Sequence, residues 1–92
     1  SLDTTLGAVG TYAMLGRTSA GKIVAGQTYT NSSSGADNNN ANLVFAGIAG
    51  SNTFSDDTAA DIRGNSATGV WRAMGHVNST SRNAASLFLR IS

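Results

Sequence analysis

Cysteine, proline and glutamate are absent from the 92-residue sequence, and His76 is its single histidine. The lack of cysteine excludes disulfide bonds and thiolate metal sites, and one histidine cannot form a multi-histidine zinc site within one chain. Charged residues make up 12% of the chain and its net charge is +1, which is too little to attract nucleic acid or an anionic membrane. The longest apolar run, residues 43–50, is far shorter than the about 18 residues that span a bilayer. We therefore expect no cofactor, no metal, no nucleic acid and no membrane insertion.

Small and polar residues dominate what is present. Gly, Ser, Thr and Asn together account for 42 of the 92 residues, and all four rank low in helix propensity. Hydrophobic residues still make up 40% of the sequence, which distinguishes the chain from a disordered linker. The composition predicts a single all-β domain over residues 1–92. Because the sequence does not begin with Met, we expect it to be part of a longer protein.

Five stretches have the apolar patterns of strands, at residues 7–16, 22–30, 43–48, 69–77 and 85–91. The first is apolar on both sides, as in a strand that is covered on each face. A short Gly-containing connection predicts that it forms a hairpin with the second stretch. The last two stretches predict another antiparallel hairpin, with Leu87, Leu89 and Ile91 on the apolar side of the final strand. The expected fold is a small antiparallel, sandwich-like module with long polar loops.

Two polar stretches separate these strands. Residues 31–42 are rich in Asn and Ser and have no apolar periodicity, which predicts a loop because these side chains bond to nearby backbone. Residues 51–66 are also polar, and within them residues 58–63 are compatible with one helical turn that ends at Gly64. Loops of this length usually have a function or are mobile.

Three segments carry a resemblance to a known family. They are Gly10-Thr11-Tyr12-Ala13, the late Gly69-Val70-Trp71-Arg72-Ala73-Met74-Gly75, and the final Leu87-Phe88-Leu89-Arg90-Ile91-Ser92. In this order they resemble the C-terminal end of phage and prophage tail-fibre proteins. Ala73 stands where relatives commonly have cysteine, which indicates a small, buried position.

The resemblance implies a β-rich homotrimer at the distal tip of a virion fibre, attached to an upstream fibre shaft. It also implies recognition of a bacterial surface receptor, often the saccharide of lipopolysaccharide, or otherwise an outer-membrane receptor. A thin core in a chain rich in Gly and Ala is consistent with packing against identical neighbours.

The polar loops supply the groups that saccharide recognition needs, because sugars are bound by arrays of neutral hydrogen bonds and by an aromatic face. The alternative is a solvated loop without a ligand, and Tyr29 can equally be a strand residue that packs against its own neighbours. The candidate ligand-binding residues are Tyr29, Asn31, Asp37, Asn38, Asn39, Asn40, Asn52, Asp56 and Asp57.

Other side chains have a structural and a functional interpretation. Asp56 and Asp57 are candidates for the paired acids of a glycosidase, but adjacent acids on an extended backbone point apart, which favours capping or solvent exposure. Trp71 is either the main core anchor or a stacking surface for a sugar, and the thin core favours the first. Arg72 and Arg90 are expected to face outward and to pair with Asp residues of a neighbouring copy.

The sequence thus predicts a non-enzymatic adhesin. A structural module that trimerises or caps the fibre end is the main alternative, and a polysaccharide depolymerase ranks third.

Overall fold

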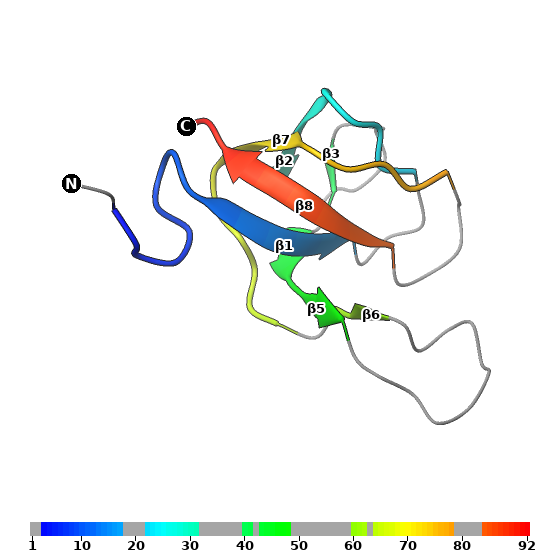
Figure 1. Ribbon diagram of the computed structural model, residues 1–92, viewed down its shortest axis with the longest axis horizontal. Coiled ribbons are helices and arrows are strands. Elements are labelled where there is room, and N and C mark those ends of the chain that lie inside the picture. Colours follow the sequence, from blue (N-terminus) through cyan, green and yellow to red (C-terminus); the bar gives the residue numbers. More distant parts are fainter. Residues whose placement is uncertain are drawn as a thin grey trace.

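The computed structural model describes residues 3–17, 22–31, 40–41, 43–48, 60–62, 64–78 and 84–92. These residues form strands and no helix, so the described part of the chain is all-β, as expected (Figure 1). The strands are β1 (Tyr12–Arg17), β2 (Thr28–Asn31), β3 (Asn40–Ala41), β4 (Leu43–Phe45), β5 (Gly47–Ile48), β6 (Ala60–Asp61), β7 (Val70–Ala73) and β8 (Ala85–Arg90).

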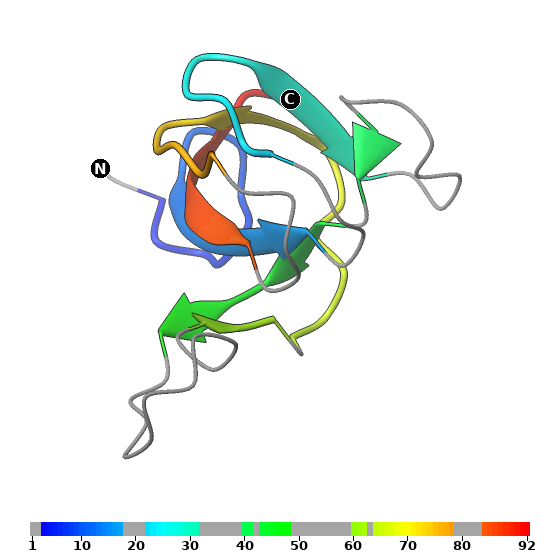
Figure 2. The ribbon, with the colours of Figure 1, turned by 90° about the vertical axis from the view of Figure 1, so that its right-hand side faces the viewer.

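Six of the strands form one sheet in the order β3-β2-β7-β8-β1-β4, and β5 and β6 form a separate two-stranded ribbon. Neighbouring strands are antiparallel except β2 and β3, which are parallel. The sheet is strongly curled, so that it has a concave and a convex side (Figure 2). Face-to-face packing of two sheets, which would make a sandwich, stays a prediction.

The first expected hairpin is wrong. β1 pairs with β8 and β4 rather than with the stretch that follows it, while β2 pairs with β7. Residues 22–30 are not one strand, because Gln27 N–H donates to Val24 O at 3.1 Å and Gly26 adopts a positive φ of 90°. This turn divides the stretch into β2 and an isolated bridge from Ile23 to Val77.

The second hairpin is confirmed. β7 and β8 are antiparallel neighbours, with Trp71 opposite Arg90 and Ala73 opposite Phe88. The predicted alternation on β7 is also observed, since Trp71 and Ala73 are fully buried and Arg72 is exposed. The burial of Ala73 agrees with the small buried position that the resemblance indicates.

The core lies on the concave side of the curled sheet. Trp71 is its largest side chain, has no exposed surface, and donates its Nε1–H to Thr68 O at 3.1 Å. Edge-to-face contacts join Trp71 to Phe45 and Tyr29 to Phe88, with ring centroids 6.4 and 5.9 Å apart. Pairs of this geometry contribute about 0.5–1.5 kcal/mol beyond the area they bury. Trp71 is therefore the core anchor that the sequence favoured. The buried cluster comprises Leu15, Ile23, Tyr29, Leu43, Ala67, Trp71, Ala73, Ala84 and Phe88.

The prediction for the buried face of β8 is wrong. Phe88 and Ser86 face the core, whereas Leu87 and Ile91 are 42% and 38% exposed. Phe88 packs on Tyr29, and Ser86 fits because the neighbouring Gly75 has no side chain: a Cβ there would collide with Ser86 Oγ. β8 thus buries the side that carries Phe88, although its other side is the more apolar one.

The segment 43–48 and the proposed helical turn also differ from expectation. Leu43 and Val44 are buried as predicted, but the stretch divides into β4 and β5, and Ile48 is highly exposed. Ala60–Asp61 is strand β6, paired with β5, so the helical turn is wrong at these residues. Residues 58, 59 and 63 lie outside the described part of the chain.

Candidate functional site

Each of the two polar segments that the sequence analysis selected lies between two strands that pair with one another. β2 and β3 are the strands before and after residues 32–39, and they pair with Thr30 opposite Asn40. Residues 49–59 connect β5 to β6, where Ile48 lies opposite Ala60. In Figure 2 the β2–β3 pair and the β5–β6 ribbon are on opposite sides of the curled sheet. The two segments therefore begin from separate places on the protomer.

Most of the predicted ligand-binding residues belong to these segments. Asn31 is the last residue of β2 and Asn40 is the first residue of β3, so the loop predicted over residues 31–42 is wrong at these positions. The role of their side chains stays a prediction. The remaining candidates from the polar segments lie outside the described residues: Asp37, Asn38, Asn39, Asn52, Asp56 and Asp57.

Tyr29 must be removed from the set of ligand-binding candidates. Its side chain is 1% exposed, and its ring contacts Phe88 edge-on. The hydroxyl accepts a hydrogen bond from Val24 N–H at 2.9 Å and donates to Gln27 Oε1 at 3.4 Å. Since the ring is enclosed on the concave side of the sheet, it offers no face to a sugar. The core role that the sequence left open is the observed one.

A buried arginine, Arg17, lies beside the ring of Tyr29. The sequence analysis did not predict this arginine as part of the core. Arg17 is 4% exposed, and its guanidinium carbon lies 5.6 Å from the centroid of the Tyr29 ring. Nη1 donates to Lys22 O at 2.6 Å, while the buried Nε has no hydrogen-bond partner. A cation over an aromatic face is attracted by the ring quadrupole. Arg17 therefore joins the end of β1 to the residues before β2, and the only sequence signal for this was an arginine ending an apolar strand.

Arg90 has a different role from the outward one expected for it. It donates through Nη1 to Gly7 O at 2.7 Å and through Nε to Ser92 O at 3.0 Å. The backbone supports the same connection, because Gly10 N–H donates to Arg90 O at 2.8 Å. Arg90 thus holds residues 7–10 against the end of β8. Arg72, in contrast, is exposed as predicted.

The convex side of the sheet carries an unexpected group of apolar side chains, which we call the outer apolar face: Tyr12, Met14, Met74, Leu87 and Leu89. Tyr12 lies opposite Leu89, and Met14 lies opposite Leu87. On the other side of β8, Arg72 lies opposite Leu89, and Met74 N–H donates to Leu87 O. Alternate residues of a strand share a face, so these pairs form two rows across β1, β8 and the end of β7.

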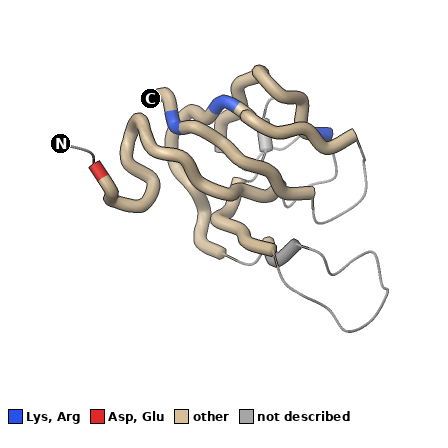
Figure 3. Tube along the Cα trace, in the orientation of Figure 1, with Lys and Arg blue, Asp and Glu red and all other residues tan. Residues whose placement is uncertain are grey.

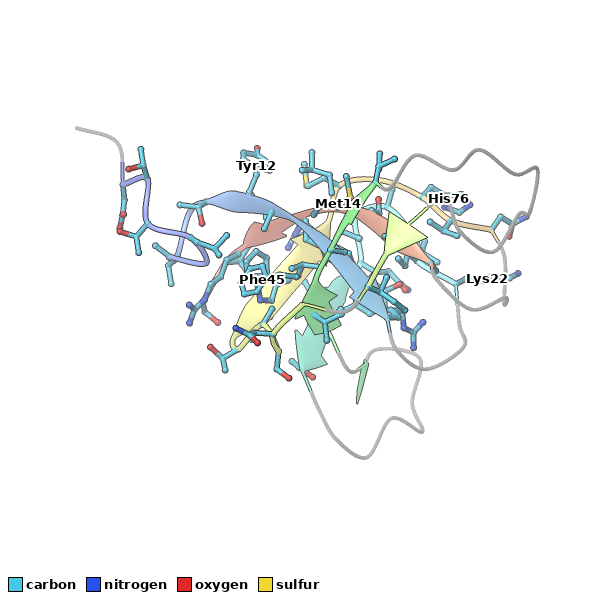
Figure 4. All side chains as sticks on the ribbon, turned by 90° about the horizontal axis from the view of Figure 1, so that it is seen from below. Tyr12, Met14, Lys22, Phe45 and His76 are labelled. Carbon is cyan, nitrogen blue, oxygen red and sulfur yellow. The ribbon has the colours of Figure 1, made fainter. Side chains whose placement is uncertain are left out.

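Three members of the outer apolar face are strongly exposed. Tyr12 is 57%, Met74 44% and Leu87 42% exposed. Figure 4 shows Tyr12 projecting from β1 on the side away from Phe45, which belongs to the core side. The signal for this face was present in the sequence, since β1 is apolar on both sides and β8 has an apolar side that Leu87 and Leu89 share.

Charge and metal-ligand chemistry are sparse in the described part of the chain. Its described side chains include four basic residues and one acidic residue, Asp3, in the N-terminal segment (Figure 3). The backbone N–H and hydroxyl of Thr5 hydrogen-bond to the Asp3 carboxylate and lower its pKa. Within the described ranges no three His, Cys, Asp or Glu residues come together as a metal site. The same ranges contain no helix long and apolar enough to cross a membrane.

Comparison with known protein families, with curated proteins and with solved structures found no match.

Proposed function

We propose that this chain is the receptor-binding tip of a phage or phage-like tail fibre, which attaches the virion to a bacterial surface saccharide such as that of lipopolysaccharide. The observation that carries the proposal is the closure of both polar segments by strand pairs, Thr30 with Asn40 and Ile48 with Ala60. Segments rich in amide and hydroxyl groups, held at their ends by a rigid sheet, are a common basis for recognition. The resemblance of the three segments quoted above supports the same assignment.

The proposed mechanism is adhesion without a chemical step. Amides and hydroxyls of residues 32–39 and 49–59 would hydrogen-bond to the saccharide as neutral donors and acceptors. Three identical chains would then present three copies of a weak site, and simultaneous engagement would raise the overall avidity by about 10²–10⁴-fold over a single site. A homotrimer is part of this proposal for that reason.

A structural module that trimerises or caps the fibre end is the second candidate. The outer apolar face favours it, because surfaces with exposed Tyr12, Met74 and Leu87 are typical of protein–protein contacts. The two candidates differ in whether the polar segments bind a ligand.

Substitution in the first polar segment distinguishes them. We expect the triple variant N38A/N39A/N40A to keep the wild-type mass while losing at least about tenfold in binding to host bacteria and to purified lipopolysaccharide, since several hydrogen bonds of about 0.5–1.5 kcal/mol each are removed. Asn65→Ala is the matched control, because residue 65 is exposed and only its backbone carbonyl is used within the fold. Unchanged binding by the triple variant would favour the structural module.

A further inference from the structure

All the sulfur of this protein belongs to two methionines, because the sequence has no cysteine and has methionine only at positions 14 and 74. Both methionines lie on the outer apolar face, on either side of Leu87. Met14 lies opposite Leu87 across β1 and β8, and Met74 N–H donates to Leu87 O at 2.8 Å. Neither side chain belongs to the buried core cluster. The oxidisable sulfur atoms of the chain are therefore gathered on one side of the sheet.

The two methionine side chains differ in their access to solvent. Met74 is 44% exposed, whereas Met14 is partly buried within β1. The indole of Trp71, a third oxidisable group, has no exposed surface and is bonded to Thr68 O. An oxidant must reach a side chain to react with it, and methionine is converted to its sulfoxide in this way. Met74 is therefore the sulfur that an oxidant in solution reaches first.

We infer that Met74 is an oxidation site that switches the outer apolar face from apolar to polar, with a peroxide as the oxidant. A lone pair on Met74 Sδ attacks one oxygen of hydrogen peroxide and the O–O bond breaks. The proton of the transferred hydroxyl passes to the departing hydroxide, which leaves as water. The sulfur loses two electrons and keeps one oxygen as a sulfoxide, and the peroxide gains the two electrons.

The sulfoxide changes the face because an apolar thioether becomes a polar group with a hydrogen-bond acceptor. Met74 lies beside Leu87, so this acceptor enters the row that Met14, Leu87 and Met74 form across three strands. The core is expected to stay intact, because Met74 is not part of it. The change is reversible, since methionine sulfoxide reductases restore the thioether. The inference goes beyond receptor binding, because residues 32–39 and 49–59 contain no sulfur.

Treatment of the dilute protein with hydrogen peroxide tests this inference. Peptide mapping by mass spectrometry locates the added oxygen, and hydrophobic-interaction chromatography of the intact protein reports the polarity of its surface. Near-ultraviolet circular dichroism of the buried Trp71 reports the fold. Met74→Leu is the test variant, because leucine keeps an apolar side chain and removes the sulfur. Met14→Leu is the matched control on the other side of β8.

The wild-type chain is expected to gain one oxygen at Met74 before Met14 reacts, to elute earlier from the column, and to keep a native Trp71 signal. A methionine sulfoxide reductase with a thiol as reductant should restore the original elution, as the thiol is oxidised to a disulfide and the oxygen leaves as water. Met14→Leu should respond as wild type does. Met74→Leu should elute unchanged after the same treatment.

Oxidation of Met14 at least as fast as that of Met74 would overturn the inference, as would an unchanged elution of the chain oxidised at Met74. Loss of the Trp71 signal on oxidation of Met74 would also overturn it, because the sulfur would then support the core rather than the outer apolar face. Unchanged lipopolysaccharide binding by N38A/N39A/N40A bears on the proposed function alone, since the oxidation of Met74 is measured without a ligand.

Discussion

At the scale of single residues, the packing depends on glycines that leave room for the groups next to them. Gly75 leaves room for Ser86, and Gly64 leaves room for the backbone of Phe45. Tyr29 and Arg17 form a buried polar pair whose partners are mostly backbone groups. The sequence identified Trp71 as core because a thin core needs its largest apolar group. It could not place Tyr29, because a tyrosine beside a polar loop suits the core and a binding site equally.

The contact between Gly75 and Ser86 gives the first prediction. Gly75→Ala is expected to lower the free energy of unfolding by about 1–3 kcal/mol, as over-packing does, because the new Cβ collides with Ser86 Oγ. Ser86→Ala in the same chain should restore most of the loss, which a double-mutant cycle in urea measures. Gly47→Ala is the control, since nothing lies within 4 Å of a Cβ there. An equal loss from Gly75→Ala in the wild-type chain and in the Ser86→Ala background would contradict this account.

The hydroxyl group of Tyr29 gives the second prediction. Tyr29→Phe leaves Val24 N–H without its acceptor and is expected to cost about 1 kcal/mol of stability, measured by chemical denaturation. Saccharide binding should not change, because the ring is buried. Tyr12→Phe, at an exposed ring, should leave stability nearly unchanged. A stability-neutral Tyr29→Phe that loses binding would show that Tyr29 belongs to the site after all.

At the scale of elements, the sequence predicted local pairing better than distant pairing. The β7–β8 hairpin followed from two alternating stretches and a turn-rich link. The partner of β1 did not follow, because local turn signals say nothing of the energy gained when β1 inserts between β8 and β4 and places Leu15 and Phe88 in one core. The face of β8 was predicted wrongly for the same reason, since Leu87, Leu89 and Ile91 make one side the more apolar, and only the packing of Phe88 on Tyr29 selects the other.

Arg90 connects elements that are distant in sequence, and this leads to a third prediction. Arg90→Gln removes the hydrogen bond from Nη1 to Gly7 O and is expected to accelerate amide exchange at Ala8 and Thr11 by about tenfold, as for a segment whose local opening costs about 1.4 kcal/mol less. Exchange at the β1–β8 ladder should stay as in wild type. Leu89→Met serves as a control on the same strand. Uniformly faster exchange would indicate loss of global stability rather than release of this segment.

At the scale of the whole molecule, the curled sheet buries its hydrophobic core on the concave side and exposes apolar side chains on the convex side. The strands that bound the polar segments, β2–β3 and β5–β6, are different from β1 and β8, which carry most of the outer apolar face, so separate substitutions test the proposed receptor binding and the proposed assembly. The sequence predicted the all-β character from composition alone. It did not predict the outer apolar face as a surface, because this required knowing that β1 and β8 are neighbours.

The solution mass of the wild-type chain at micromolar concentration tests the central claim most directly. We expect light scattering to give three times the 9.3 kDa of one chain, with the assembly weakened by dilution. A stable, cooperatively folding protein of 9.3 kDa at every concentration would contradict it.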